Sequence, residues 1–81
     1  MRHVVYMLVC ADTTLYVGCT NNLEKRIKEH NESKRGAHYT KIRRPVSLCY
    51  SETFTTLKKA RQREAAIKRL PRKEKLCLKQ R

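Results

Sequence analysis

The chain has 81 residues, of which 20 are Lys or Arg and 7 are Asp or Glu, so its formal net charge is +13. A chain of this length hides only about 60% of its unfolded surface, which excludes a large or divided core, and we expect one domain over residues 1–81. The charge favours a polyanionic partner through electrostatic steering and counterion release. Basic composition alone separates neither DNA from RNA nor nucleic acid from an anionic membrane surface.

The first two predicted elements are the strands of a hairpin. Residues 4–10 are apolar at every position, as is typical of a central strand covered on both faces. Residues 15–19 form its partner beyond a polar turn. The apolar run 4–11 is too short to span a bilayer and begins too close to the N-terminus for a signal peptide. We therefore expect a cytoplasmic protein that does not associate with membranes.

A helix and a third strand follow. Asn21 can cap the helix while Glu24 reaches back to it, and the helix continues to about His30. A loop rich in Lys and Arg separates this helix from residues 46–54, in which apolar and polar side chains alternate. That alternation predicts a strand whose apolar side chains, Leu48 among them, lie on one buried face.

Two more helices complete the chain. Residues 56–69 form the longer one, and Pro71 suits the first turn of a separate short helix. The predicted order is strand, strand, helix, strand, helix, helix. This order indicates an α+β fold, with a small three-stranded antiparallel sheet flanked by helices.

Two tyrosines, Tyr6 and Tyr16, can supply phenols to one site only if they lie on the same face of the hairpin. Tyr16 must then pair opposite Cys10 or Leu8, rather than opposite the residue between them. A three-residue loop at 12–14 pairs Cys10 with Tyr16, and loops of this length are common in hairpins. On opposite faces, each tyrosine is most simply an aromatic residue of the core.

Arg26 and His30 border the buried face of the first helix. At about 100° per residue, they lie beside the stripe formed by Leu23 and Ile27. One interpretation is a functional pair directed at the sheet. The other is that Arg26 extends across the sheet edge to solvent and His30 is a satisfied boundary histidine. The spacing leaves both interpretations open.

Glu64 falls within the inner arc of the second long helix, about 20° from Leu57 and on the same side as Ile67. A carboxylate in that position is desolvated unless a cation or a metal compensates its charge. The ordinary alternative is an ion pair along the helix with Lys68 or Arg61, which are correctly spaced for it.

The basic loop combines cations with an interleaved aromatic residue, which suits a phosphate backbone and an unstacked base. For any single lysine, a solvated surface loop is the simpler interpretation. As a group, the predicted nucleic-acid-binding residues are Lys34, Arg35, Tyr39, Lys41, Arg43 and Arg44.

Six short motifs, in their order and spacing, resemble the GIY-YIG nuclease superfamily, and specifically its small stand-alone bacterial members. The motifs are Val4-Val5-Tyr6, Tyr16-Val17-Gly18, the helix 22–31, Ala37-His38-Tyr39-Thr40, Arg43-Arg44-Pro45-Val46 and the acidic helix 63–68. The resemblance covers nearly the whole chain. Many active members of the superfamily carry an asparagine in the C-terminal region, whereas this chain has none beyond Asn31.

The resemblance implies hydrolysis of a nucleic-acid phosphodiester, DNA more than RNA, with one divalent cation. Glu64 would hold that cation, Mg²⁺ or Mn²⁺, and Arg26 would bind the scissile phosphate. Tyr6 would take the proton from the attacking water, with Tyr16 and His30 orienting the water or the phosphate. A free phenol has a pKa near 10, and we expect Arg26, the cation and the surplus lysines to ease its ionisation.

Three functions follow from these features. A metal-dependent endonuclease-like domain acting on DNA requires Glu64 on an inward arc opposite Arg26. A non-catalytic nucleic-acid-binding module on the same scaffold needs the basic loop but neither Tyr6 nor Glu64. A protein-interaction adaptor would use the charge for an acidic partner, and a lack of salt-sensitive binding to nucleic acid would favour it.

Overall fold

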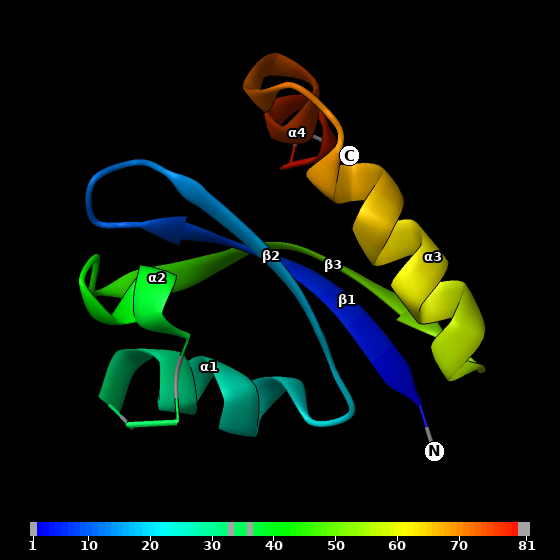
Figure 1. The fold of residues 1–81 in the computed structure, drawn as a ribbon, viewed down its shortest axis with the longest axis horizontal. Helices are drawn as coiled ribbons and strands as arrows, with labels where there is room; N and C mark the ends of the chain where they lie inside the picture. Colours follow the sequence, from blue (N-terminus) through cyan, green and yellow to red (C-terminus); the bar gives the residue numbers. More distant parts are fainter. Residues whose placement is uncertain (1, 33, 36, 80–81) are drawn as a thin grey trace.

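The computed structural model describes residues 2–32, 34, 35 and 37–79. The elements in chain order are β1 (His3–Cys10), β2 (Leu15–Thr20), α1 (Leu23–Glu32), α2 (His38–Lys41), β3 (Val46–Phe54), α3 (Leu57–Lys68) and α4 (Arg72–Lys79) (Figure 1). The predicted α+β fold is confirmed, with the three strands and the three longer helices in the expected order. The sequence analysis missed α2, a single turn within the basic loop.

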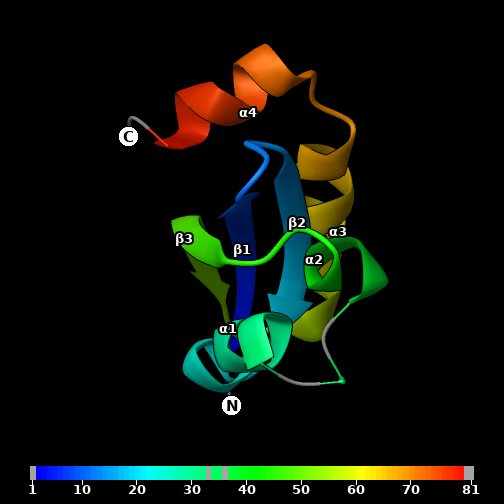
Figure 2. The same ribbon diagram turned by 90° about the vertical axis from the view of Figure 1, so that its left-hand side faces the viewer.

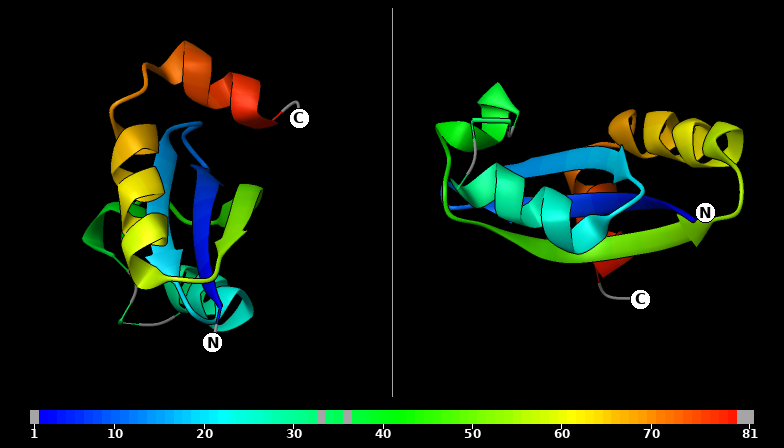
Figure 3. Two further views of the ribbon diagram at one scale, coloured as in Figure 1. Left: turned by 90° about the vertical axis from the view of Figure 1, so that its right-hand side faces the viewer. Right: turned by 90° about the horizontal axis from the view of Figure 1, so that it is seen from below.

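The sheet is antiparallel with strand order β2-β1-β3, so β1 is central, as its continuous apolar run predicted (Figure 2). Alternate side chains of β1 enter two separate cores. Val5 and Met7 pack with residues of α3 and α4 on one face, while Tyr6 and Leu8 pack towards α1 on the other. Figure 3 shows α3 running alongside β2. The central strand is therefore buried on both faces.

The hairpin has a three-residue loop, but it occupies 11–13 and not 12–14. The Asp12 side chain accepts hydrogen bonds from the Thr14 amide (3.1 Å) and hydroxyl (2.5 Å), and Thr13 takes a left-handed conformation with φ 69°. Tyr16 consequently pairs with Leu8, the second of the two permitted partners, and the predicted pairing with Cys10 is wrong. Leu8 and Cys10 are two residues apart and lie on the same face of β1, so Tyr6 and Tyr16 still share a face.

The third strand departs from strict alternation. Met7 pairs with Tyr50 while Leu8 pairs with Leu48, so Cys49 is an extra residue in β3. Such a bulge interrupts the two-residue period of the strand. The prediction of a buried Leu48 is wrong, since this side chain is 42% exposed.

The helix boundaries agree with the sequence analysis, but one cap does not. The Lys25 amide donates to Asn22 Oδ1 at 3.2 Å, so Asn22 and not Asn21 caps α1. For α3, Thr56 is the N-cap and accepts from the Lys59 amide at 3.2 Å, so the helix begins one residue later than predicted. Among the described residues, no helix is long and apolar enough to cross a membrane.

The inner face of α3 is narrower than predicted. Ala60 and Ile67 are fully buried against the sheet, but Leu57 is 44% exposed. Leu57 lies on the rim of a cavity between α3 and the sheet, so the prediction that it belongs to the core is wrong.

Gly18 provides the space in which the Tyr6 ring lies. The two residues pair across β1 and β2, and a Cβ atom on Gly18 would lie 2.6 Å from Tyr6 Cζ. Any larger residue would push the ring away from β2, because packed interiors have little spare volume.

We expect Gly18→Ala to lower the free energy of unfolding by about 1–3 kcal/mol through this overlap. Urea denaturation measures the loss, and the same substitution in a Tyr6→Leu background is the matched control. The cost should be smaller there, because the ring is absent. Equal costs in the two backgrounds would contradict the assigned contact.

Candidate active site

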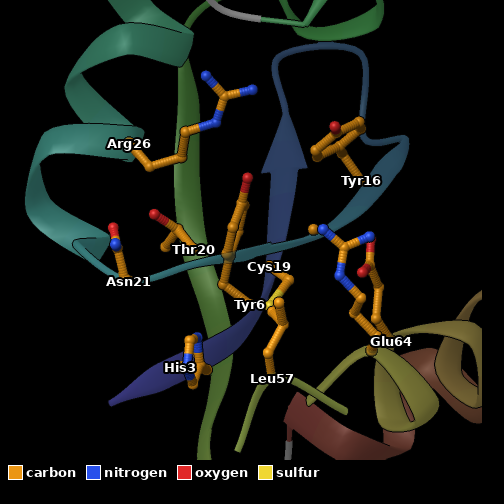
Figure 4. A pocket seen from close by; sticks show the side chains of 11 residues that line it. His3, Tyr6, Tyr16, Cys19, Thr20, Asn21, Arg26, Leu57 and Glu64 are labelled. Atoms are coloured by element: carbon orange, nitrogen blue, oxygen red, sulfur yellow. The ribbon is translucent and has the colours of Figure 1, made fainter. Parts of the chain in front are cut away.

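An open cavity of about 390 Å³ lies beside β1 and β2, between α1 and α3. Figure 4 shows Arg26 and Glu64 reaching it from different sides, with the hydroxyl of Tyr6 directed towards the Arg26 guanidinium. The residues that line the cavity are His3, Tyr6, Tyr16, Gly18, Cys19, Thr20, Asn21, Arg26, Leu57, Arg61 and Glu64. Four predicted site residues thus meet in one hollow.

His30, the fifth predicted member, lies behind the cavity in direct contact with Tyr6. Its Nε2 is 2.8 Å from the Tyr6 hydroxyl, and its Nδ1 is 2.7 Å from Thr40 Oγ1. Both His30 and Thr40 are fully buried, and Tyr6 is 1% exposed. His30 is therefore more deeply buried than a boundary histidine, and both ring nitrogens have partners.

Burial controls the ionisation of this pair. Desolvation raises the pKa of Tyr6 to about 12, although a hydrogen bond and the charge of Arg26 act in the opposite direction. The expectation that neighbouring cations ease the ionisation of Tyr6 is correct for Arg26, but burial outweighs it. Desolvation, and next the charge of Arg26, lower the pKa of His30 to about 4. Near neutral pH, the phenol and the imidazole are both uncharged.

Arg26 is held near Tyr6 by its own contacts. One guanidinium nitrogen lies 3.4 Å from Glu29 Oε1 and donates to the carbonyl of Arg35 at 3.0 Å. The side chain is 27% exposed, so it reaches the cavity without being sealed from solvent. Arg26 is thus a pre-oriented cation at the mouth of the site.

Tyr16 connects the cavity to the basic loop through a series of rings. Its ring centroid is 6.4 Å from that of Tyr6, 5.1 Å from that of His30 and 6.0 Å from that of Tyr39. The Arg43 guanidinium lies 3.9 Å from the Tyr39 ring centroid, which is cation–π geometry. The aromatic part of the basic loop is therefore packed against the site.

Glu64 both forms an ion pair within α3 and lines the cavity. Its Oε2 forms a 2.9 Å ion pair with Lys68 one turn along α3, which is the ordinary alternative. The side chain is nevertheless only 19% exposed and lines the cavity. Among the described residues, no three His, Cys, Asp or Glu side chains form a metal-binding group. Glu64 is the carboxylate that this cavity offers to a cation.

The six predicted nucleic-acid-binding residues separate into two groups, and none of them is among the described residues that line the cavity. Lys34, Arg35 and Tyr39 are exposed, and Lys41 is half-buried. Arg43 and Arg44 are half-buried, and their side chains donate to backbone carbonyl groups of the fold.

Arg44 donates to the carbonyl oxygens of His30 (2.5 Å) and Glu29 (3.2 Å), which belong to the last turns of α1. The last carbonyl groups of a helix generally lack partners within it, and a cation there also complements the helix dipole. Arg43 donates to the Tyr39 carbonyl at 3.0 Å. Its Nε also lies 3.0 Å from Asp12 Oδ2, which is close enough for an ion pair, but the two groups are not aligned for a hydrogen bond. Both arginines thus have structural contacts that their assignment to phosphate binding did not anticipate.

Several contributors to the site were not among the predicted site residues. Gly18, Asn21 and Arg61 line the cavity, and Thr40 supports His30. Arg61 lies three residues before Glu64 on α3, so helical spacing could have placed it at the cavity. Nothing in the local sequence marks Thr40, because its partner is ten residues away.

Asn31, the last asparagine of the chain, is not near this cavity. Its side chain exchanges two hydrogen bonds with the backbone of Val46, at 3.0 and 2.7 Å. It joins α1 to the start of β3, and this role is structural.

Residues 2–76 match the family model of the GIY-YIG catalytic domain. The chain belongs to the GIY-YIG family. This domain is a nuclease fold. The resemblance stated from the six motifs is confirmed at the level of the family.

Proteins designated UPF0213 are similar to the chain over most of its length. The UPF0213 protein RBAM_000440 of Bacillus velezensis is 55% identical over 73 residues, which cover 90% of this chain and 73% of that protein. The UPF0213 protein YazA of Bacillus subtilis is 49% identical over 74 residues, covering 91% and 74% respectively.

Two solution NMR structures are similar to this fold. The UPF0213 protein BH0048 from Bacillus halodurans matches with a TM-score of 0.61 and 38% identity, over 96% of this chain and 82% of that one. The protein EF2693 from E. faecalis matches with a TM-score of 0.64 and 40% identity, over 93% and 79%.

The lowered pKa of His30 predicts a dependence of stability on pH. Below about pH 6.5 the unfolded chain binds a proton at His30 that the folded protein excludes down to about pH 4. We expect the free energy of unfolding to fall across this window by up to about 3 kcal/mol, and this contribution is fully present above pH 6.5. Urea denaturation at a series of pH values measures it, with His30→Gln as the non-titrating control. Parallel pH profiles for the two proteins would exclude His30 as the source.

The contacts of Arg44 predict that its removal destabilises the fold. Arg44→Ala leaves two carbonyl oxygens of α1 without this donor, and we expect a loss of about 1–3 kcal/mol in the free energy of unfolding. Lys34→Ala removes the same charge from an exposed position and should change stability by less than about 0.5 kcal/mol. Chemical denaturation of both variants tests the difference, and equal effects would show that Arg44 acts through net charge.

Proposed function

We propose that this protein is a metal-dependent endonuclease that hydrolyses phosphodiester bonds of DNA. The observation that carries the proposal is the presence of Tyr6, Arg26 and Glu64 on one cavity, reached from β1, α1 and α3. A general base, a cation for the phosphate and a metal ligand are the groups such a hydrolysis uses. The similarity to GIY-YIG nucleases favours DNA over RNA as the substrate.

Arg26 is suited to bind the scissile phosphate. Its guanidinium is partly exposed and now contacts Glu29 and a backbone carbonyl, at 3.4 and 3.0 Å. A phosphate can replace these partners with shorter, bidentate hydrogen bonds. The same charge would then stabilise the transition state, in which negative charge builds up on the phosphoryl oxygens.

The residues of the cavity fit a hard divalent cation held mainly by water and substrate. Glu64 supplies one carboxylate, and burial raises the pKa of the Cys19 thiol, so the thiolate that a softer metal prefers is disfavoured. Mg²⁺ is commonly bound through one or two carboxylates plus substrate phosphates, and it keeps several waters. When bound, such a cation would neutralise charge on the phosphate and the leaving oxygen.

Tyr6 can serve as the base only if its own proton leaves in the same step. With a pKa of about 12, ionising the resting phenol at pH 7 costs about 7 kcal/mol. His30 Nε2 lies 2.8 Å from the phenol oxygen and is within reach of that proton. Tyr16, on the same face, would orient the attacking water or the phosphate.

The test compares the wild type with Tyr6→Phe, Arg26→Ala and Glu64→Ala on plasmid DNA, branched DNA and RNA, with Mg²⁺ or Mn²⁺. Each variant should lose cleavage by at least about 100-fold, because each removes a group that acts on the reacting atoms. Binding of DNA should persist in Tyr6→Phe and Glu64→Ala. Lys58→Ala, on the exposed side of α3 and away from the cavity lining, is the matched control and should cleave normally.

One observation favours the second candidate, a non-catalytic nucleic-acid-binding module. The 2.9 Å ion pair with Lys68 satisfies part of the Glu64 carboxylate without any metal. Tight, salt-sensitive binding by a wild type that cleaves none of the three substrates would support this module and reject the endonuclease.

A further inference from the structure

Three buried polar groups form a continuous chain of hydrogen bonds from α2 through α1 to β1. Thr40 Oγ1 is 2.7 Å from His30 Nδ1, and His30 Nε2 is 2.8 Å from the Tyr6 hydroxyl. Thr40 and His30 are fully buried and Tyr6 is nearly so. Water therefore cannot replace any link in the chain, and the direction of each hydrogen bond matters.

The direction of these hydrogen bonds is set at the α2 end of the series, by Thr40. Thr40 donates its one hydroxyl proton to the carbonyl oxygen of Ala37, at 2.9 Å. A carbonyl oxygen can only accept, so the proton of Thr40 is committed to Ala37 and its oxygen accepts from His30 Nδ1. The reverse arrangement would place two acceptor oxygens 2.9 Å apart with no proton between them.

The cavity end of the chain agrees with this direction. The buried imidazole of His30 is neutral near pH 7, so it carries one proton on one of its two nitrogens. When that proton is on Nδ1, Nε2 has a lone pair, and this lone pair faces Tyr6. The Tyr6 hydroxyl is directed towards the Arg26 guanidinium (Figure 4). A guanidinium has donors only, so it faces a lone pair of the phenol oxygen. The phenol proton is then left to point at His30.

We infer that Thr40 is a positioning residue of the proposed hydrolysis, which holds His30 in the tautomer able to receive the proton of Tyr6. The inference rests on the proposed function. As the oxygen of the attacking water bonds to phosphorus, one proton of this water passes to the Tyr6 oxygen and the Tyr6 proton passes to His30 Nε2. The bond from phosphorus to the leaving oxygen breaks, and this oxygen departs with the bonding electron pair and takes a proton from solvent. The imidazolium that results keeps its Nδ1–H bond to Thr40.

The first experiment measures the tautomer without any substrate. Nitrogen-15 NMR of the imidazole rings distinguishes a protonated from an unprotonated ring nitrogen, and His30→Gln identifies the signals of His30 among those of the three histidines. In the wild type, we expect protonated Nδ1 and unprotonated Nε2. In Thr40→Val, which keeps the shape but removes the hydroxyl, the Nε2-protonated tautomer should gain population. A wild type with protonated Nε2, or an unchanged tautomer in Thr40→Val, would overturn the inference.

The second experiment separates positioning from a structural role. We expect Thr40→Val to lower kcat by at least about 10-fold and to leave KM nearly unchanged. The loss should not exceed the roughly 10⁴-fold effect of removing a general base altogether. Thr40→Ser restores the hydroxyl and should restore most of kcat. Equal losses in the Ser and Val variants would indicate a packing role and reject the inference.

The two experiments also distinguish failure of this inference from failure of the proposed function. A wild type that cleaves no substrate rejects the hydrolysis and, with it, the role of Thr40 in it, while the tautomer measured by NMR still stands. An active wild type with an unchanged kcat in Thr40→Val rejects Thr40 alone. If Thr40→Val does not fold, the wild-type tautomer still decides the hydrogen-bond direction, because a protonated Nε2 in the wild type would overturn the inference.

Discussion

The hydrogen bond between Tyr6 and His30 is the interaction on which the site depends. It joins the central strand to α1 across 24 residues of sequence, and both side chains are almost completely buried. A buried polar group without a partner is costly, so the phenol and the imidazole must remain together for the fold to be stable. The Tyr6 ring can lie there only because β2 has a glycine beside it. The packing that places the phenol at the cavity also raises its pKa.

Two arginines of the basic loop make contacts that stabilise the fold. Arg44 completes the end of α1, and Arg43 lies between Asp12 and the Tyr39 ring. These contacts hold α2 against α1 and the hairpin loop, and α2 carries Thr40 inward and Tyr39 outward. Exposed cations such as Lys34 remain available for long-range attraction of a polyanion. The loop is thus a structural element with a basic surface.

Local patterns predicted most of the fold. The apolar run of β1, the extent of α3 and the break at Pro71 depend on neighbouring residues, which sequence displays directly. The patterns failed where neighbouring residues offered similar alternatives. Asn22 displaced Asn21 as the cap of α1, a bulge at Cys49 left Leu48 exposed, and the loop of the hairpin moved by one residue. In each case the local alternatives differ by little free energy, and tertiary packing selects between them.

By itself, the sequence determined the α+β order of elements and the surplus of positive charge, whereas the register that puts Tyr6 and Tyr16 on one face came from the structure. The sequence also supplied the motifs that identify the GIY-YIG family. Only the tertiary structure decided that His30 bonds to Tyr6 and Thr40, and that Glu64 both pairs with Lys68 and lines the cavity. The structure also decided that burial outweighs Arg26 in setting the pKa of Tyr6. Desolvation and hydrogen-bond direction depend on the full three-dimensional surroundings of a group, and spacing along the chain does not contain that information.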